Sequence, residues 1–228
     1  MKEKVISDIR VYKSNVPNII GNALPSDIYN KRLNIVLHRI VMKLRENHFS
    51  LGEFDHLYIN FTTCLDKNFI TPSQRGCDPY HPWYRYYDFG VNEAFYNELD
   101  FEQSTESIIL LVRELLLKHF AIDEVTQKIV KSSTDDAVSK KADMLMRYKI
   151  KETANRKAIL YLRYLDCGEY YPLLCVYDTE GNELLKKNLP ICTDLNPYGT
   201  IILSNKKVTI KPKSNAFVRE SKPISFEF

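Results

Sequence analysis

Glycine is scarce in this chain, with seven residues in 228, and the glycine-rich motifs that hold nucleotide phosphates do not occur. The sequence contains neither GxxxxGKS/T nor GxGxxG. The GxSxG turn of the α/β-hydrolases and the HExxH zinc motif are also missing. These absences argue against a nucleotide-binding protein and leave no recognisable catalytic motif.

Long apolar runs and a leader pattern are missing as well. The most apolar stretch, Ser107 to Ile122, is interrupted by Arg113, Glu114 and Lys118, and it is shorter than the ~18–20 residues of a membrane span. Charges recur through the opening residues, MKEKVISDIRVYKS, unlike the apolar core of a signal peptide. We therefore expect a cytoplasmic protein that does not enter a membrane.

The cysteines form no metal-binding or disulfide pattern. Their number is odd and no CxxC pair occurs, which favours reduced thiols. Cys77 and His81 lie four residues apart and could form a nucleophile–base pair, or join His38, His48 or His56 around zinc. A zinc site needs four ligands and no second spaced pair exists, so we expect no metal and no cofactor. The five cysteines are Cys64, Cys77, Cys167, Cys175 and Cys192.

Charge is uneven along the chain, although the net charge is only +3. Residues 49–114 contain eleven acidic and four basic side chains. Residues 135–228 are basic, with lysines concentrated near residues 140–157 and 206–213. The acidic section would attract a basic partner, whereas the basic section would suit an acidic one.

Hydrophobic periodicity in the N-terminal half predicts helices and a few strands. Leu33, Leu37, Ile40 and Leu44 follow the 3.6-residue period of an amphipathic helix, with Ser26 as a possible N-cap. The helix that follows Ser104 is apolar on most sides, which predicts a central, buried position. The expected elements are strands at 5–14, 53–65 and 83–91, helices at 27–47, 92–99 and 104–121, and a helical turn or two after Asp123.

The C-terminal half reads as strands and tight turns. Hairpins are expected around Gly181 and across residues 205–207, and the polar segment 131–141 is the best candidate boundary. We predict an α+β fold, with helices packed on a largely antiparallel sheet. Its two parts would be a helix-rich α+β part, 1–133, and an antiparallel β-meander, 134–228, packed into one compact unit.

The basic meander raises the alternative of a nucleic-acid-binding module. Arg147, Lys149 and Lys151 alternate along one strand, which would place them on one face as a basic stripe. No RNP-like motif or helix-turn-helix accompanies them. Charged sheet faces and edges more often serve solubility, so nucleic acid is an unlikely partner.

The most unusual segment is CDPYHPWYRYYDFG, residues 77–90, in which six of fourteen residues are aromatic. On a strand, Trp83, Tyr87 and Phe89 would face one way, and Tyr84 and Tyr86 the other. Tyrosine and tryptophan dominate interface hot spots because they offer large, rigid surfaces with a polar group. The expected partner-binding residues are Asp78, His81, Trp83, Tyr84, Tyr86, Tyr87 and Asp88.

This profile resembles the immunity proteins of bacterial toxin systems, which are small α+β proteins without catalytic motifs. The acidic, aromatic section 49–114 is similar to what a blocker of a basic, nuclease-like toxin would carry. The resemblance implies a non-enzymatic binding protein that occludes the active site of a cognate toxin. The main alternative is a hydrolase that uses carboxylates of section 49–114, which would require two of them in one cleft.

Overall fold

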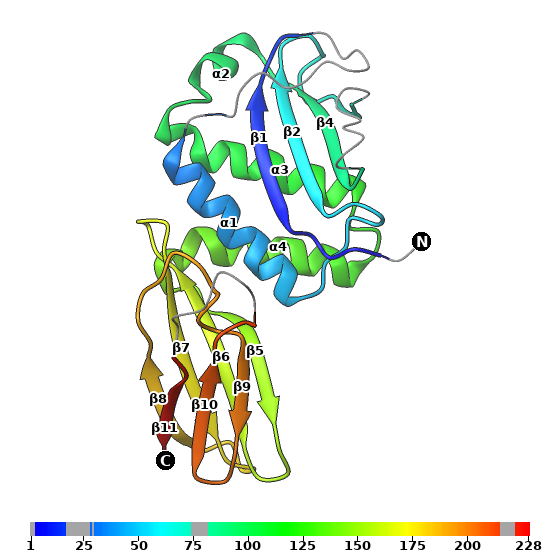
Figure 1. The fold of residues 1–228 in the computed structure, drawn as a ribbon. Helices are drawn as coiled ribbons and strands as arrows, with labels where there is room; N and C mark the ends of the chain where they lie inside the picture. The colour runs from blue at the N-terminus through cyan, green and yellow to red at the C-terminus, as the bar shows by residue number, and fades with distance from the viewer. Residues whose placement is uncertain (1–2, 17–27, 29, 74–81, 215–221) are drawn as a thin grey trace. The chain divides into compact units, whose positions relative to one another are not determined.

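The computed structural model describes residues 3–16, 28, 30–73, 82–214 and 222–228. Contacts within the chain divide it into two compact units, Met1–Lys141 and Ala142–Phe228. Each unit has its own sheet or sheets (Figure 1). The predicted α+β class is confirmed, because helices and strands both occur and the C-terminal strands are antiparallel.

The first unit is built on a mixed four-stranded sheet of order β1-β2-β4-β3. β1, β2 and β4 are parallel, and β3 runs antiparallel to β4. Parallel neighbours need a crossover connection, which α1 supplies between β1 and β2. The elements are β1 (Asp8–Lys13), α1 (Lys31–Glu46), β2 (His56–Thr62), β3 (Ile70–Pro72), β4 (Tyr84–Gly90), α2 (Glu93–Glu98), the 3-10 turn η1 (Glu102–Ser104), α3 (Thr105–His119) and α4 (Glu124–Ser139).

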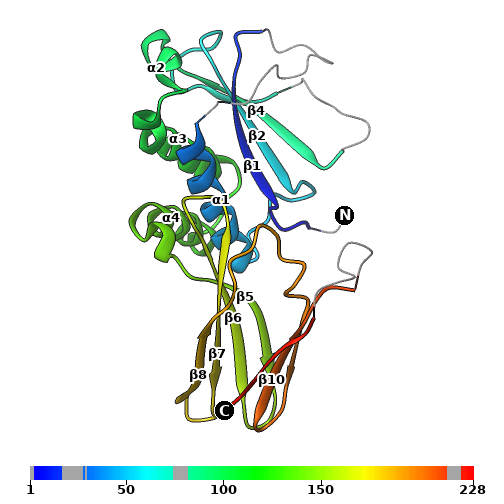
Figure 2. The same ribbon diagram turned by 60° about the vertical axis from the view of Figure 1, so that its left-hand side comes forward.

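Helices pack against one face of this sheet. Ile9, Leu57 and Phe89 are buried on that face, and Tyr87 packs on His119 at the end of α3. Figures 1 and 2 show α1 and α3 on the same side of β1, β2 and β4. Since side chains alternate along a strand, the opposite face must be lined by the intervening residues.

The first helix confirms the predicted apolar stripe but begins later than expected. Leu33, Leu37 and Ile40 are buried, and the helix starts at Lys31 rather than at residue 27. Asn30 caps it, because its Oδ1 accepts a hydrogen bond from the Leu33 amide at 3.0 Å. The Nδ2 of Asn30 also donates to the Phe101 carbonyl at 2.9 Å, which ties the helix start to the segment before α3. Ser26, the expected cap, lies outside the described residues.

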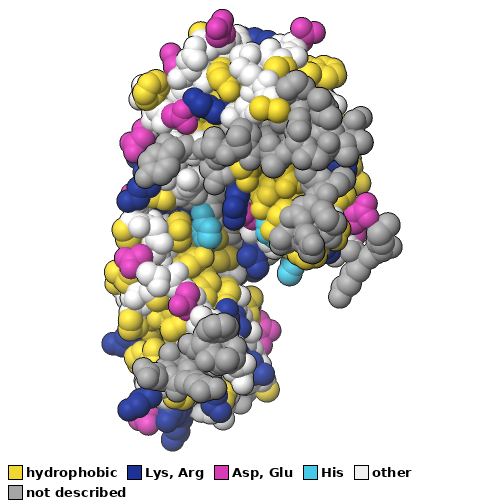
Figure 3. All heavy atoms as spheres, turned by 45° about the horizontal axis from the view of Figure 1, so that its top comes forward, with side chains coloured by type: hydrophobic (Ala, Val, Ile, Leu, Met, Phe, Trp, Pro, Cys, Tyr) yellow, Lys and Arg dark blue, Asp and Glu magenta, His cyan; other side chains and the backbone are white. Residues whose placement is uncertain are grey.

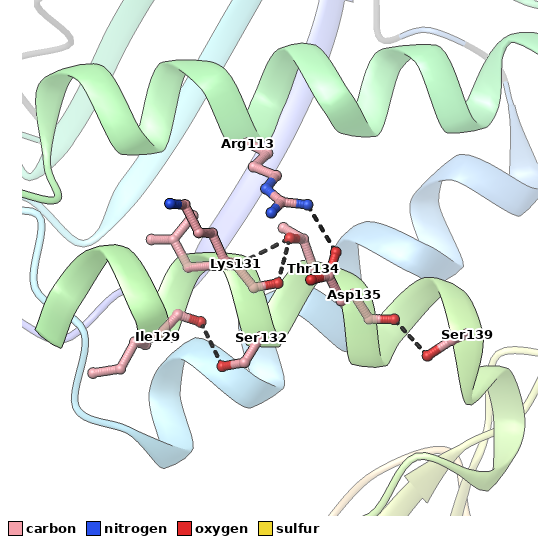
Figure 4. Close-up of polar contacts among 8 residues, drawn as sticks. Arg113, Ile129, Lys131, Ser132, Thr134, Asp135 and Ser139 are labelled. Atoms are coloured by element: carbon pink, nitrogen blue, oxygen red, sulfur yellow. Dashed lines mark hydrogen bonds and ion pairs between the residues drawn. The ribbon is translucent and has the colours of Figure 1, made fainter. Parts of the chain in front are cut away.

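The predicted boundary segment 131–141 is largely helical. α4 is capped by Asp123 and continues to Ser139, so the division between the units falls after Lys141 and not within the helix. Three of the four hydroxyl side chains in this segment donate to carbonyls inside the helix, whereas the buried Ser133 hydroxyl has no partner among the described residues (Figure 4). Ser132 donates to Ile129, Thr134 to Lys131, and Ser139 to Asp135, all at backbone carbonyls.

Among the described residues, no helix has the length and apolar character needed to cross a membrane.

α3 has the most apolar sequence of the helices, yet it is not buried on all sides. Leu110 is 60% exposed on its outer side. The prediction of a central, buried helix therefore holds for the inner side of α3, where Ile108 and Val112 are buried, but not for its outer side.

The second unit consists of two antiparallel sheets that enclose one core. Ala158, Leu160, Leu174 and Val176 from one sheet form a buried cluster with Val208 and its neighbours from the other. The sheets have the orders β5-β6-β7-β8 and β11-β10-β9. The elements are the 3-10 turn η2 (Lys141–Asp143), β5 (Met146–Glu152), β6 (Lys157–Tyr164), β7 (Tyr170–Tyr177), β8 (Glu183–Asn188), β9 (Thr200–Leu203), β10 (Lys207–Lys211) and β11 (Ile224–Glu227).

The predicted basic stripe on β5 does not form. A register shift between Arg147 and Lys149 interrupts the strand's alternation. Arg147 pairs with Tyr161, whereas Lys149 pairs with the core residue Leu160 and therefore lies on the opposite face. The Lys149 ammonium donates to the Gly199 carbonyl, and burial lowers its pKa.

Candidate functional site

The sheet register of the first unit brings six side chains together on the face opposite the helices. Across the three parallel strands, Arg10 pairs with Tyr58, which pairs with Tyr86. One step earlier on the same face, His56 pairs with Tyr84. We name this cluster the aromatic face, and it comprises Arg10, Tyr12, His56, Tyr58, Tyr84 and Tyr86.

Tyr58 is the centre of the aromatic face. Its ring centroid lies 4.8 Å from that of Tyr84, 5.2 Å from that of Tyr86 and 5.6 Å from that of Tyr12. The Arg10 guanidinium lies over the same ring at 5.6 Å. Tilted and edge-on aromatic pairs of this kind each contribute about 0.5–1.5 kcal/mol beyond burial. The face is therefore a preformed, rigid surface.

Exposure is graded across the aromatic face. Tyr58 and Tyr12 are 5% and 9% exposed, whereas His56, Tyr84 and Tyr86 are half-buried. Burial raises the pKa of the Tyr58 phenol, as does its hydrogen bond with Tyr84, so the hydroxyl stays protonated at neutral pH. The Tyr58 hydroxyl can therefore both donate and accept a hydrogen bond.

A buried polar pair adjoins the tyrosines on the same sheet face. Asn60 is paired in register with Asp88, and the Asn60 Nδ2 donates to an Asp88 carboxylate oxygen at 2.8 Å. The same nitrogen reaches the Ser14 carbonyl at 3.2 Å. Both side chains are almost fully buried, which requires such hydrogen bonds. This pair fixes the register between β2 and β4 next to Tyr58 and Tyr86.

The predicted partner-binding residues separate into four groups. Tyr84 and Tyr86 lie on the aromatic face, as the predicted alternation requires. Tyr87 is buried against α3 and Asp88 is buried beside Asn60, so we leave both out of the contact surface. Trp83 is half-buried at the start of β4, with the Lys4 ammonium 5.2 Å from its ring. Asp78 and His81 lie outside the described residues.

Several acidic side chains of section 49–114 are paired with basic side chains, two of which come from elsewhere in the chain. The carboxylate of Asp100 pairs with Lys13, and that of Glu106 with Arg32. Asp55 accepts from the Nδ1 of His56 at 2.6 Å. On the surface drawn in Figure 3, the described acidic side chains are dispersed among basic, apolar and uncharged ones. The acidic section in sequence is therefore not a continuous acidic patch on that face.

The aromatic face consists of aromatic rings, one imidazole and one guanidinium, and has no carboxylate of its own. In the described part of the chain, no three His, Cys, Asp or Glu side chains gather closely enough to hold a metal ion. Near the aromatic face, the carboxylates of Asp8 and Asp55 are each bound to a neighbouring base, Arg10 and His56. A hydrolase would need two carboxyl groups facing the same substrate bond, and this cluster does not offer them.

Four residues of the aromatic face were not predicted from the sequence. Arg10 and Tyr12 come from β1, and His56 and Tyr58 from β2. In both strands these residues alternate with apolar ones. This two-residue period is the sequence signal that could have placed them on one face of the sheet. The parallel pairing that aligns them is decided by tertiary structure.

Comparisons with protein-family models, curated proteins and solved structures find no match for this chain.

Proposed function

We propose that the protein is a non-enzymatic, cytosolic binding protein that recognises a basic protein partner through the aromatic face and Trp83. As toxin-neutralising immunity proteins do, it would occlude the active site of a nuclease-like toxin. The observation that carries the proposal is the shared register of β1, β2 and β4, which gathers three tyrosines around Tyr58 on the face opposite the described helices.

Physical reasons support a protein partner on this face. Half-buried tyrosines lose little conformational entropy on binding and contribute both apolar area and hydroxyl hydrogen bonds. Tyr84 and Tyr86 have this exposure, and the buried Tyr58 packs beside both of them. The exposed carboxylates of Glu53 and Asp66 in the same unit would assist the approach of a basic partner.

The test co-expresses the protein with each product of the neighbouring genes and measures growth rescue and complex formation. We expect rescue by the wild type and loss of rescue by the double variant Tyr84→Ala/Tyr86→Ala. Hot-spot tyrosines predict weakening of at least about 30-fold in Kd. The variant Tyr84→Phe/Tyr86→Phe keeps the rings but lacks the hydroxyls. Its Kd therefore shows how much the hydroxyls contribute to binding.

A matched control removes a half-buried tyrosine from the other unit. Tyr161→Ala on β6 should leave binding unchanged. Circular dichroism of every variant checks that it is folded. Equal binding by a folded Tyr84→Ala/Tyr86→Ala variant would rule out this face as the contact surface.

A further inference from the structure

The outer side of α3 carries two leucines that its core contacts do not require. Val112, Leu115 and other apolar residues of the inner stripe are already fully buried. Leu110 and Leu117 lie on the outer side, the first 60% exposed and the second half-buried. They are seven residues apart, about 10 Å along the helix axis. A purely solvated helix face would favour charged residues at these positions.

These leucines line a groove between α3 and α4. One hollow, of about 390 Å³, is bounded by Leu110, Leu117 and Lys118 from α3 and by Gln127 and Lys131 from α4. A second hollow, of about 460 Å³, shares Gln127 and Lys131 and continues along α4. The two hollows adjoin at Gln127 and Lys131, and the second is lined by residues of α4 alone.

A single ion pair spans the groove. The Arg113 guanidinium donates from α3 to the Asp135 carboxylate on α4 at 2.7 Å (Figure 4). This pair links the two helices at the surface and offsets both charges. A partner bound in the groove would therefore contact the charged lining residues other than Arg113 and Asp135.

The remaining cations outnumber the remaining carboxylates. Lys118, Lys128 and Lys131 are exposed and form no ion pair within the described part of the chain. Two carboxylates, Glu114 and Glu124, also line the groove. The lysines follow the groove from the end of α3 along α4. Three lysines against two carboxylates leave an excess of one positive charge, which a segment with carboxylates on its flanks would complement.

We propose that the α3–α4 groove binds an acidic, amphipathic helical segment of a second protein. Its apolar side chains would pack on Leu110 and Leu117, and its carboxylates would face Lys118, Lys128 and Lys131. Helices laid into a groove commonly use anchors spaced by one and two turns, which matches the spacing of the two leucines. This surface is separate from the aromatic face and does not depend on the function proposed for it.

The test uses fluorescence polarisation with a set of labelled helical peptides about four turns long. Each has leucines at heptad spacing and flanking glutamates, and a matched set replaces every glutamate by lysine. We expect saturable binding of acidic peptides that weakens with added salt. Lys128→Glu/Lys131→Glu and Leu110→Ser/Leu117→Ser should each weaken binding at least about tenfold, because one removes the charges and the other the apolar floor.

The control Lys206→Glu/Lys207→Glu makes the same charge change in the second unit and should leave binding unaltered. The proposal is overturned if no acidic peptide binds, if lysine peptides bind equally well, or if Lys128→Glu/Lys131→Glu binds as the wild type does. Light scattering adds a further outcome. A dimer that Leu110→Ser/Leu117→Ser dissociates would assign the groove to a second copy instead.

Discussion

The ring centroids of Tyr58 on β2 and Tyr84 on β4 lie 4.8 Å apart, although the residues are far apart in sequence. The contact exists because parallel pairing aligns Tyr58 with Tyr86 and His56 with Tyr84, so each tyrosine of β4 lies beside Tyr58. The buried pair of Asn60 and Asp88 holds the same register one step further along. The aromatic face is therefore a product of strand alignment.

Replacing Asn60 by aspartate should destabilise the protein strongly at neutral pH. Asn60→Asp places a second carboxyl group against Asp88 and removes the amide donor at 2.8 Å. Two buried carboxyl groups at this distance share one proton, which raises a pKa in the folded state. Stability is then highest below the ordinary carboxyl pKa and is lost as pH rises. We expect a loss of about 3–5 kcal/mol at pH 7, by urea unfolding, and a smaller loss at pH 4–5.

The exposed variant Asn97→Asp in α2 adds the same charge at the surface. It should change the free energy of unfolding by less than about 0.5 kcal/mol. A loss for Asn60→Asp that does not depend on pH would show that the two carboxyl groups are not coupled.

Fluorescence of Trp83, the single tryptophan, should report its half-buried position and its cationic neighbour. The Lys4 ammonium, 5.2 Å from the ring, attracts anions and repels cations. Iodide should therefore quench more efficiently than caesium. Lys4→Gln should lower the iodide quenching constant about twofold at low salt. Neutral acrylamide is the control, and equal iodide quenching in both proteins would contradict the contact.

Acid should destabilise the fold through His119. Burial against Tyr87, assisted by the charge of Lys118, lowers the pKa of His119 in the folded state. The unfolded chain takes up a proton near its ordinary pKa of 6.5, whereas the folded chain resists it. Stability is therefore full above that pH and falls as pH decreases.

Replacing His119 by glutamine tests this contribution. We expect the free energy of unfolding of His119→Gln to depend less on pH between 7 and 5 than that of the wild type. His48→Asn, which removes an exposed histidine, controls for the loss of a surface side chain. An unchanged slope in His119→Gln would assign the acid sensitivity to other groups.

Tyr198 should be a principal stabilising residue of the second unit. Its ring is 1% exposed within the core between the sheets, and its hydroxyl donates to the Pro190 carbonyl at 2.9 Å. Tyr198→Phe should cost about 1 kcal/mol by losing that hydrogen bond. Tyr198→Ala should cost about 3–5 kcal/mol by leaving a cavity. Urea unfolding followed by circular dichroism measures both, and Tyr161→Phe, on a half-buried ring, should cost less than about 0.5 kcal/mol.

Local sequence signals predicted most elements of the fold. The apolar period of α1, the alternation of β4 and the glycine turn between β7 and β8 depend on neighbouring residues, so a single segment reveals them. Gly181 has φ +89°, a conformation that favours glycine, and it marks that turn as expected. β3 and β11 were missed because short strands carry too few residues to show a period.

Two predictions failed for local reasons, one through side-chain hydrogen bonds in α4 and the other through a register shift in β5. The polar run 131–141 looked like a linker because serine and threonine compete with the backbone for hydrogen bonds. In α4, Ser132 and Thr134 bond back to carbonyls of their own helix, which removes that competition. In β5, the register shift after Arg147 places Arg147 and Lys149 on opposite faces of the sheet. The basic side chains therefore do not form the predicted stripe.

The sequence by itself determined the fold class, the helical and extended segments, and the presence of Tyr84 and Tyr86 on one side of a strand. Only the tertiary structure decided that Arg10, Tyr12 and Tyr58 join them, and that Leu110 and Leu117 line a groove. The physical reason is that periodicity gives the direction of a side chain relative to its own strand or helix. Which other element that side chain meets depends on pairing and packing between segments distant in sequence, and no local pattern encodes those partners.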